Sequence, residues 1–332
     1  MDTRGVFGLE RSSSGKSLQI VIAGISNLDV VFRPESKSSN MVANKRRIEA
    51  RSWGDISHQP VLAVHGRQDN AATFNHLIPL LPRGKYHFLC IDLPGHGLSS
   101  HFPAGLLYRV LTDYIITVRK VVDHFKWRQV IYMGHSLGGL VGYYFAGAFP
   151  ELVKKLIVID IMSHSNLPTH HHTELIRHYY EKLHEFEEKS LTKQPPRYSY
   201  KEALSRVITG RPSELSITSA KTLLTRDLKQ VSEDRYIFCK DQRVKFLVFP
   251  IISNEQHMAL LSSVRCPLLL IMGNQSSLKN FALAQELLQM FKKNCEEFRY
   301  FVVEGGHDLH LNNPEIVAPL VTNFLNSLKS SL

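Results

Sequence analysis

The sequence predicts an α/β fold in which helices cover both faces of a mostly parallel central sheet. Short apolar runs bounded by turn residues recur along the chain and alternate with segments of helical periodicity. Each run is four or five residues long and apolar on both faces, as in the buried strands of parallel sheets. Regular alternation of strands and helices is typical of such sheets. The runs lie at 61–64, 88–91, 130–133, 156–159, 268–272 and 300–303.

The composition excludes several classes of protein. The chain has 332 residues, of which 43% are hydrophobic, so it can bury a sizeable core as one large domain or two small ones. It has no apolar run of about 18 residues that would span a membrane, and no signal-peptide pattern follows the apolar patch at 18–25. The four cysteines lack C-x-x-C spacing. We therefore expect free cysteines in a reducing compartment, without a metal-binding or redox role.

The net charge is strongly positive, but the basic residues are not clustered in any one segment of the sequence. A net charge of +10 comes from 40 basic and 30 acidic residues that are spread along the chain, without a nucleic-acid motif. We expect a solvated basic exterior and no nucleic-acid partner. The chain ends in Ser330-Ser331-Leu332, one residue away from the peroxisomal signal Ser-Lys-Leu. The cytoplasm and the peroxisome are the two compartments that this leaves open.

The remaining elements follow in order. Residues 1–45 are rich in Ser, Arg and Lys and are expected to form a partly ordered extension, and the first strand is predicted at 46–53. Periodic apolar positions predict helices at 111–125 and 282–291, and small and apolar residues predict another at 140–148. Asn313-Pro314 would open a terminal helix.

The alternation breaks between about 165 and 261, where the chain has a helical pattern. Over 174–189, an apolar stripe is flanked by charges and contains Leu175, Tyr179, Leu183 and Phe186. An insertion between two strands can cover the carboxyl edge of the sheet, so we expect 165–261 to be a helical cap on a core of 46–164 and 262–332. The aromatic residues Tyr179, Tyr180 and Phe186 could line an acyl pocket or form the core of the cap.

The strongest chemical signal is a Gly-x-Ser-x-Gly motif from Gly134 to Gly138. It follows the strand at 130–133 and precedes the helix at 140–148, which is the context of a nucleophile elbow. A serine at such a turn is strained, and the glycines let neighbouring backbone approach it. We therefore expect Ser136 to be a nucleophile, with the N–H of Leu137 directed at a developing oxyanion.

Two further strand ends supply candidate partners. His65-Gly66 follows the strand at 61–64, and the next backbone N–H, of Arg67 or Gln68, could be the second oxyanion donor; the predicted site includes Arg67. After the last strand, Gly305-Gly306 precedes His307, the candidate general base. His310 competes with His307 but lies further from the strand end.

The turn from Asp92 to Ser99 also follows a strand, but its residues do not indicate a catalytic role. It contains Pro94 and two glycines, which make a compact turn, so we expect a structural role for it. His96 within it would then be a hydrogen-bonded turn residue and not a base.

Together these motifs resemble the α/β-hydrolase superfamily over about residues 46–332, and most closely its serine-hydrolase-like family. The resemblance is carried by His65-Gly66 with Asp69-Asn70-Ala71, Leu77 to Pro82, Gly95 to Ser100, Gly134 to Gly139, and Lys240 to Arg243. It implies a hydrolase core with a cap after the sixth strand of the fold, no cofactor and an acyl-serine intermediate. Arg67 stands where relatives carry a bulky apolar residue, so their substrate preference is not carried over.

The resemblance also bears on the acid of a catalytic triad. Relatives tend to carry an Asp in the loop after the strand at 268–272, but here Gly273 to Lys279 contains no carboxylate. Some members carry it instead at the end of the strand after the elbow helix, which in this chain is Asp160. The order Ser136, Asp160, His307 is that of the fold. The alternative is that Asp160 caps the first turn of the cap.

Two functional interpretations remain open. The first is a serine hydrolase that acts on a small-molecule acyl ester or thioester, since Ser136 argues against epoxide hydrolases and haloalkane dehalogenases, which need a carboxylate at the elbow. The second is a ligand-binding protein that keeps the scaffold with weak or no catalysis. His170-His171-His172 cannot all face one ion, so we expect no metal. The oligomeric state is open.

Overall fold

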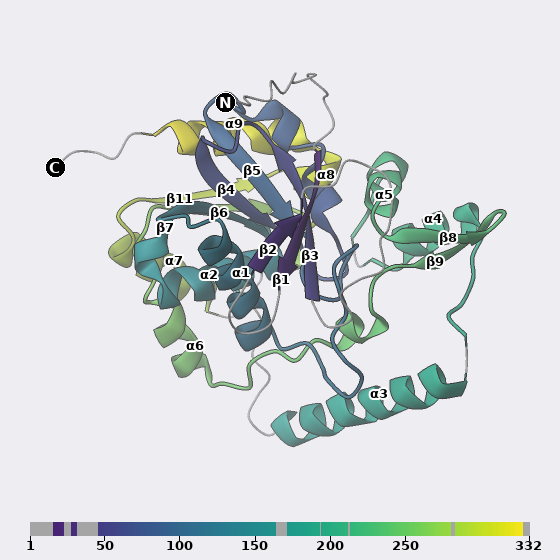
Figure 1. Ribbon diagram of the computed structural model, residues 1–332. Coiled ribbons are helices and arrows are strands. Elements are labelled where there is room, and N and C mark those ends of the chain that lie inside the picture. Colours follow the sequence, from purple (N-terminus) through teal and green to yellow (C-terminus); the bar gives the residue numbers. More distant parts are fainter. Residues whose placement is uncertain are drawn as a thin grey trace, which may run out of the picture.

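The computed structural model describes residues 16–22, 28–31, 46–163, 171–192, 194–211, 213–279 and 283–327. Within them, nine strands form one sheet in the order β11-β10-β7-β6-β4-β5-β3-β1-β2 (Figure 1). The strands are β1 (Lys16–Ile22), β2 (Leu28–Val31), β3 (Arg46–Trp53), β4 (Gln59–Val64), β5 (Tyr86–Ile91), β6 (Val130–His135), β7 (Val153–Ile159), β10 (Leu268–Gly273) and β11 (Phe298–Val303).

The prediction of a mostly parallel sheet is confirmed. From β5 through β4, β6, β7 and β10 to β11, every neighbouring pair is parallel, whereas β3, β1 and β2 are added antiparallel. β5, β6 and β10 are buried along their whole length. β11 is an exception to the expected two-sided burial, because it is the edge strand and leaves Val302 49% exposed.

Helices cover both faces of the sheet, as predicted. α1 (Ile115–His124), α2 (Leu137–Ala148) and α7 (Ala284–Asn294) lie on one face, and α8 (Leu309–Asn312) and α9 (Pro314–Asn326) lie on the other (Figure 1). Successive strand residues enter opposite cores, so that Tyr132 packs with the first group and Met133 with α9. Ten of the 12 residues of α2 are buried. The elbow at the N-terminus of α2 is therefore held in place by a well-packed helix.

Two N-terminal strands were not predicted from the sequence. β1 and β2 fall in the segment expected to be a partly ordered extension, and β1 pairs with β3 from Lys16↔Ser52 to Ile22↔Arg46. This pairing is made with residues about 30 positions away, so the local pattern does not reveal it. The two strands extend the sheet beyond β3 on the side opposite β11.

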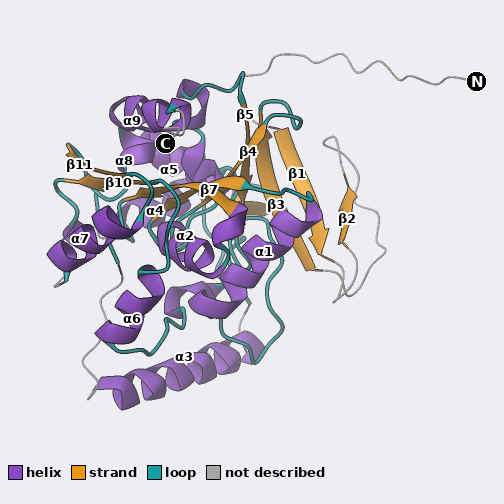
Figure 2. Ribbon diagram, turned by 90° about the vertical axis from the view of Figure 1, so that its left-hand side faces the viewer, coloured by secondary structure: helices purple, strands orange, loops and turns teal. Residues whose placement is uncertain are grey.

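The segment between β7 and β10 interrupts the sheet and is called here the insertion (residues 171–261). It contains α3 (His172–Thr192), α4 (Tyr200–Thr209), α5 (Ile217–Leu224), β8 (Leu228–Ser232), β9 (Arg235–Phe238) and α6 (Asn254–Leu261). It follows the seventh strand in chain order, not the sixth. α4, β8 and β9 lie to one side of the sheet and its helical layers (Figure 1), and α3 lies below them in both views (Figures 1 and 2).

The helical prediction for the insertion is only partly right. β8 and β9 form an antiparallel hairpin, whose turn holds Asp234 at a φ of 47°. Asp tolerates this left-handed conformation, which favours the tight turn over a continued helix. On α3 the predicted stripe is present, since Tyr179 is buried and Leu175 and Phe186 are partly buried. Tyr180, one position further round the helix, is 69% exposed.

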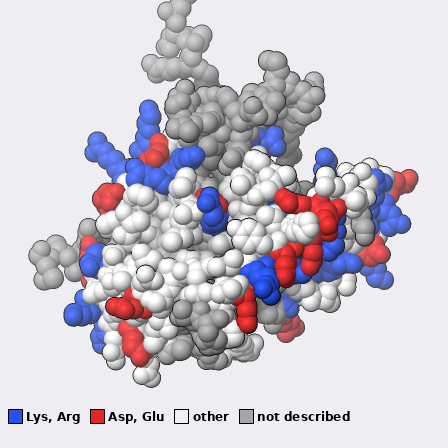
Figure 3. Space-filling model, turned by 90° about the horizontal axis from the view of Figure 1, so that it is seen from below, with Lys and Arg blue, Asp and Glu red and all other residues white. Residues whose placement is uncertain are grey.

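Charged side chains of both signs lie on the face seen from below. Acidic side chains gather there in a short band right of centre with basic ones beside it, and another basic group lies at the upper left (Figure 3). None of the helices in the described ranges is long and apolar enough to cross a membrane. His170 and the C-terminal Ser330-Ser331-Leu332 lie outside the described residues.

Candidate active site

Ser136 lies at the turn between β6 and α2 in a strained backbone conformation. Its φ of 51° and ψ of −119° are outside the regions that side-chain-bearing residues prefer. The Ser136 N–H donates to the carbonyl of Ile159 at 2.9 Å, which ties the turn to β7. A Cβ at Gly138 would lie 2.0 Å from the Val64 carbonyl oxygen, so only glycine permits this packing. The sequence motif therefore adopts the geometry of a nucleophile elbow.

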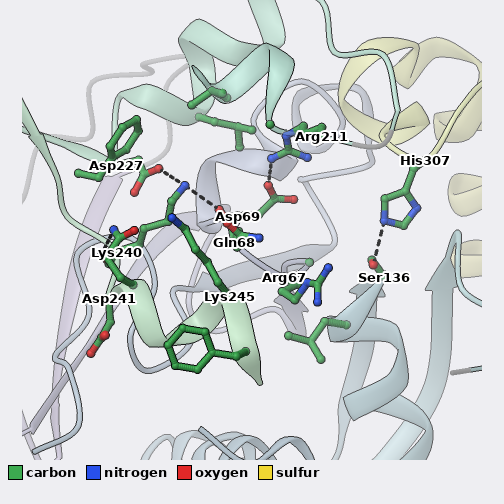
Figure 4. Close-up of a pocket in the computed structure, with 18 of the residues that line it drawn as sticks. Arg67, Gln68, Asp69, Ser136, Arg211, Asp227, Lys240, Asp241, Lys245 and His307 are labelled. Atoms are coloured by element: carbon green, nitrogen blue, oxygen red, sulfur yellow. Dashed lines mark hydrogen bonds and ion pairs between the residues drawn. The ribbon is translucent and has the colours of Figure 1, made fainter. Parts of the chain in front are cut away.

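The structure brings His307 to Ser136. His307 lies in the loop after β11, and its Nε2 is 2.9 Å from Ser136 Oγ. Its Nδ1 is 2.6 Å from Asp160 Oδ2. Because a carboxylate only accepts, His307 Nδ1 carries the proton and Nε2 is left to accept from the serine hydroxyl. The three residues thus form a continuous chain of hydrogen bonds (Figure 4 shows its Ser136–His307 part).

Asp160 is fully buried at the end of β7 and has well-defined partners. Its Oδ1 accepts the Gly273 N–H at 2.7 Å, and its Oδ2 accepts the Ser276 hydroxyl at 2.5 Å. Gly273 is the last residue of β10 and Ser276 lies in the loop after it, where relatives tend to carry the acid. That loop therefore lacks a carboxylate but supports the one on β7. In the described residues the Asp160 carboxylate accepts no backbone N–H from a following helical turn, so nothing there supports the capping alternative.

The surroundings of His307 adjust its basicity. Burial lowers the pKa of His307, but the hydrogen bond to Asp160 and the charges of Asp308, Asp160 and Asp69 raise it, and the net pKa lies above the ordinary value of 6.5. A base with this pKa binds the serine proton more strongly than a free imidazole does. The arrangement can therefore accept a proton from Ser136 and stabilise the imidazolium that forms.

The competing histidines lie elsewhere. His310 is buried behind His135, with ring centroids 4.0 Å apart, and its Nε2 is 2.8 Å from Thr73 Oγ1. His96 hydrogen-bonds the carbonyl of Pro94 and packs against His65. Burial lowers the pKa of both His310 and His96 well below 6.5. They are therefore neutral structural residues.

Backbone donors lie beside Ser136. Leu137 is the first residue of α2, so its N–H has no carbonyl one turn earlier in the helix and is available to a ligand. Gly66 packs against the elbow so closely that a Cβ there would lie 3.2 Å from the Ser136 Cβ. This contact brings the loop that contains Arg67 and Gln68 to the serine, and Gln68 has a φ of 65°. The geometry leaves both N–H groups as candidate second donors.

Sequence reasoning missed a buried Asp–Arg–Asp bridge beside the triad. Arg211, from the insertion, donates to Asp69 and, at 2.8 Å, to Asp308. Asp69 lies in the loop after Gly66, and Asp308 follows His307. Burial raises the pKa of each carboxylate, but Arg211 outweighs it and holds both below the ordinary value of 3.8. One arginine thus joins the insertion to two loops of the site.

Two more arginines anchor the insertion. Arg226 donates to Asp92 at 2.6 Å, and Asp92 also accepts the N–H groups of Ala71 and Leu98. The turn after β5 is therefore structural, as expected. Arg243 donates to Asp241 at 2.7 Å and to three carbonyls of the 102–106 loop. No local signal could have indicated these contacts with the core, because Arg226 and Asp92 are 134 positions apart and Arg243 and Leu106 are 137 positions apart.

A metal ion does not fit the one cluster of candidate ligands in the described ranges. One ligand atom each of Asp69, His135 and Asp308 lie within 4.8 Å of one another. The Arg211 guanidinium already binds both carboxylates there, and a divalent cation would have to displace it. His171 pairs instead with Glu174 on the surface. The cluster is therefore an ion-pair network.

Ser136 and His307 open into a large cavity between the core and the insertion (Figure 4). Its volume is about 2490 Å³, above the usual range for a small-molecule pocket. Tyr179 and Phe186 of α3 line it, which fits the first of the two alternatives that the sequence left open for these aromatic residues, whereas Tyr180 does not line it. The carbonyl end of a substrate could reach the serine while the rest lies against the insertion.

Comparison with known proteins agrees with this geometry. Residues 59–314 match the model of the alpha/beta hydrolase fold family. The chain is 35% identical to a probable serine hydrolase of Drosophila melanogaster over 84% of either chain, and 33% identical to a serine hydrolase-like protein of Danio rerio over 82% of this chain and 83% of the relative. A hypothetical protein of Pseudomonas aeruginosa PAO1 superposes with a TM-score of 0.74 at 26% identity, over 85% of this chain and 96% of that one.

Proposed function

Because this chain belongs to the alpha/beta hydrolase fold family, whose relatives here are named serine hydrolases, we propose that it hydrolyses carboxylic esters or thioesters through an acyl-serine intermediate. Family membership supports a hydrolase in general. The ester class and the mechanism are the proposal. A serine nucleophile suits acyl transfer, whereas epoxide and haloalkane hydrolysis in this fold need a carboxylate at the elbow.

In the proposed reaction, the Ser136 hydroxyl attacks the acyl carbonyl while His307 Nε2 accepts its proton. An Oγ–C bond forms, the bond from the carbonyl carbon to the leaving oxygen or sulfur breaks, and His307 returns the proton to the leaving group. Water then attacks the acyl-serine with His307 again as base, which releases the acid and restores Ser136. Asp160 holds the imidazole in the required tautomer and stabilises its charged form. The reaction needs no cofactor or metal.

The oxyanion of each tetrahedral intermediate would accept the backbone N–H groups of Leu137 and Arg67. The N–H of Leu137 is at the N-terminus of α2, where the helix dipole adds to the stabilisation of negative charge. Arg67 is the next residue after Gly66, which packs closely against the elbow, so its N–H lies in the loop beside Ser136. Removing one such donor typically costs about 100-fold or more in turnover.

The observation that carries the proposal is the Ser136–His307–Asp160 chain, with contacts of 2.9 and 2.6 Å at a serine of φ 51°. A strained serine has no structural benefit that would maintain it, and a buried carboxylate behind the imidazole favours the base. A binding protein that had lost catalysis would have no need of this arrangement. We also propose that the insertion acts as a cap that limits substrate size, because its residues form one wall of the cavity.

Fluorophosphonate labelling tests the nucleophile directly. We expect one covalent adduct on the wild-type protein at neutral pH, located at Ser136 by peptide mass spectrometry and absent in Ser136→Ala. Ser205→Ala, which removes an exposed hydroxyl from α4, is the matched control and should label like the wild type. A folded wild-type protein that does not label would instead support the ligand-binding interpretation.

A further inference from the structure

Resting on the proposed function, we propose that the cavity selects acyl substrates that carry an anionic group, a carboxylate or a phosphate, which Arg67 and Lys245 bind on the insertion side of Ser136. The cavity lining holds nine Lys and Arg side chains and seven Asp and Glu side chains. The inference depends on which of these charges are already neutralised by protein partners.

Most of the cations are paired. Arg211 binds Asp69 and Asp308, Lys240 binds Asp227, Arg243 binds Asp241, and Lys182 and Lys189 both bind Glu185. Five carboxylates are thereby used. Within the described ranges, the lining cations without an ion pair to a carboxylate are Arg67, Arg206, Lys229 and Lys245.

Arg67 is the unpaired cation nearest in sequence to the oxyanion loop. Its side chain is exposed and lines the cavity, in place of the bulky apolar residue expected after His-Gly. It lines the same cavity as Tyr179 of α3, whose pKa is raised by burial and lowered in part by the hydrogen bond from Phe249 and by the Arg67 charge. The Tyr179 hydroxyl accepts the Phe249 N–H at 3.4 Å, and its own proton has no acceptor in the described part of the chain. An anion there could accept from both side chains.

Lys245 adds a second cation on the opposite wall. It is exposed to the cavity and makes no hydrogen bond or ion pair with the residues that the structure describes. Its pKa is lowered by burial and then by the like charges of Lys240 and Arg206, so its ammonium is destabilised by its surroundings. Figure 4 shows Lys245 and Lys240 on one side of the cavity, Ser136 and His307 on the other, and Arg67 between them. A bound anion would relieve this repulsion.

The remaining carboxylates of the lining fit this polarity. Glu304 precedes His307 in the loop after β11, and the backbone carbonyl of Glu214 accepts from Asn312 near the same loop. They therefore lie toward the His307 side. An anion would be repelled from that side and attracted toward Arg67 and Lys245.

Two pairs of substrates test the inference. The members of the first pair differ by an anionic group in the acyl part, and those of the second differ by anionic groups in the leaving group. The first pair is mono-4-nitrophenyl glutarate against 4-nitrophenyl pentanoate, which has the same carbon chain without the carboxylate. The second is S-acetyl coenzyme A against S-acetyl-N-acetylcysteamine, which lacks phosphates. We expect kcat/KM for the anionic member of at least one pair to be about tenfold higher, as one added charge contact would give. The pair that shows the preference identifies which part carries the anion.

Variants assign the preference to residues. The double variant Arg67→Gln/Lys245→Gln should bring the ratio of kcat/KM values to about one, and Lys292→Gln, an exposed lysine on α7 outside the cavity, should keep the wild-type ratio. About 0.5 M NaCl should also reduce the wild-type ratio, because salt screens exposed charges. A ratio of one or less for both pairs, or a preference that survives the double variant, would overturn the inference while leaving the hydrolase proposal intact.

Binding separates this inference from the proposed function. If no ester is turned over, titration calorimetry of the same two pairs with Ser136→Ala measures the selectivity without catalysis. Tighter binding of the anionic members, lost in the Ser136→Ala protein that also carries Arg67→Gln/Lys245→Gln, would support the inference even where the hydrolase proposal fails. Equal or weaker binding of the anionic members would contradict it.

Discussion

Asp160 is a residue whose environment defines its role. It is fully buried, it has a φ of 52°, and it accepts hydrogen bonds from Gly273, Ser276 and His307. A buried carboxylate without such donors would be costly. Since three donors fix both oxygens, the carboxylate stays aligned with the imidazole.

We expect Asp160→Asn to lower kcat by roughly three to four orders of magnitude. An amide in this place can donate to His307 and favours the wrong tautomer, as for removal of the acid in other triads. Initial rates with a 4-nitrophenyl ester measure this. Asp123→Asn, which alters an exposed carboxylate on α1, is the control and should keep the wild-type rate. Near-normal turnover of Asp160→Asn would reduce the site to a Ser–His dyad.

The pH dependence follows from the pKa of His307. The base must be neutral to accept the serine proton, and its pKa lies above 6.5. Activity should therefore fall as the pH decreases through this pKa, so the acid limb of kcat/KM should have its midpoint above 6.5. Asp160→Asn should move the midpoint to lower pH, because the hydrogen bond and the charge that raise the pKa are removed. A wild-type midpoint at or below 6.5 would contradict this assignment.

Residues of the site differ in how far the sequence reveals them. Ser136, Asp160 and His307 each follow a parallel strand, and the carboxyl ends of parallel strands meet at one edge of the sheet, so their approach could be predicted. Arg211 could not be, because it lies in a turn of the insertion and pairs with carboxylates 97 and 142 positions away. No periodicity or motif records a contact of that kind.

At the scale of elements, the insertion is fixed to the core by largely buried arginines. Arg211 and Arg226 bind buried aspartates of the core, whereas Arg243 pairs with Asp241 of the insertion and donates to three carbonyls of the 102–106 loop. Removal of one member of such a pair leaves an uncompensated buried charge, which costs more than the pair itself contributes. The cap would then be a rigidly attached wall of the cavity in this region and not a freely moving lid.

Arg211→Ala should lower the free energy of unfolding by about 3 kcal/mol, since Asp69 and Asp308 would both lose their counter-ion. Urea unfolding followed by circular dichroism measures this. Arg235→Ala, which removes an exposed ion pair with Glu202 on the surface of the insertion, is the matched control and should cost no more than about 0.5 kcal/mol. Equal effects of the two variants would mean that the bridge does not anchor the insertion.

Within the insertion, the sequence predicted α3 well and the hairpin poorly. The four apolar positions of α3 recur at helical spacing, and this local pattern survives in the structure. β8 and β9 are short, β8 is mostly exposed and β9 is mostly half-buried, so neither has the alternation of buried and exposed residues that identifies a strand. Their pairing depends on the turn at Asp234, whose signal is weak.

For the whole molecule, the central strands and their parallel direction could be predicted, and the edges of the sheet could not. Central strands are buried on both faces, so their sequences are continuous apolar runs. β11 at one edge is half exposed, and β1 and β2 at the other are defined by antiparallel pairing with β3 and with each other. Edge strands carry less of the burial that leaves a pattern in the sequence.

The four cysteines give a prediction for the molecule as a whole. Burial raises the pKa of Cys90 and Cys266, that of Cys239 to about 11 and that of Cys295 to about 12, so all four are protonated near neutral pH. We expect iodoacetamide to leave the mass of the native protein and the proposed hydrolysis of a 4-nitrophenyl ester unchanged. Loss of activity in parallel with modification of one cysteine would point to a thiol in the reaction.

The most direct test of the central claim is the rate of hydrolysis of a 4-nitrophenyl ester series by the wild-type protein and by Ser136→Ala. The account predicts measurable turnover of at least one ester by the wild type. It predicts a decrease of about 10⁴-fold or more in Ser136→Ala, because the Ser136 Oγ forms the covalent bond to the acyl group in the proposed intermediate. Circular dichroism spectra of the two proteins should coincide, so that the loss is one of chemistry and not of fold. Wild-type rates in Ser136→Ala would contradict the account.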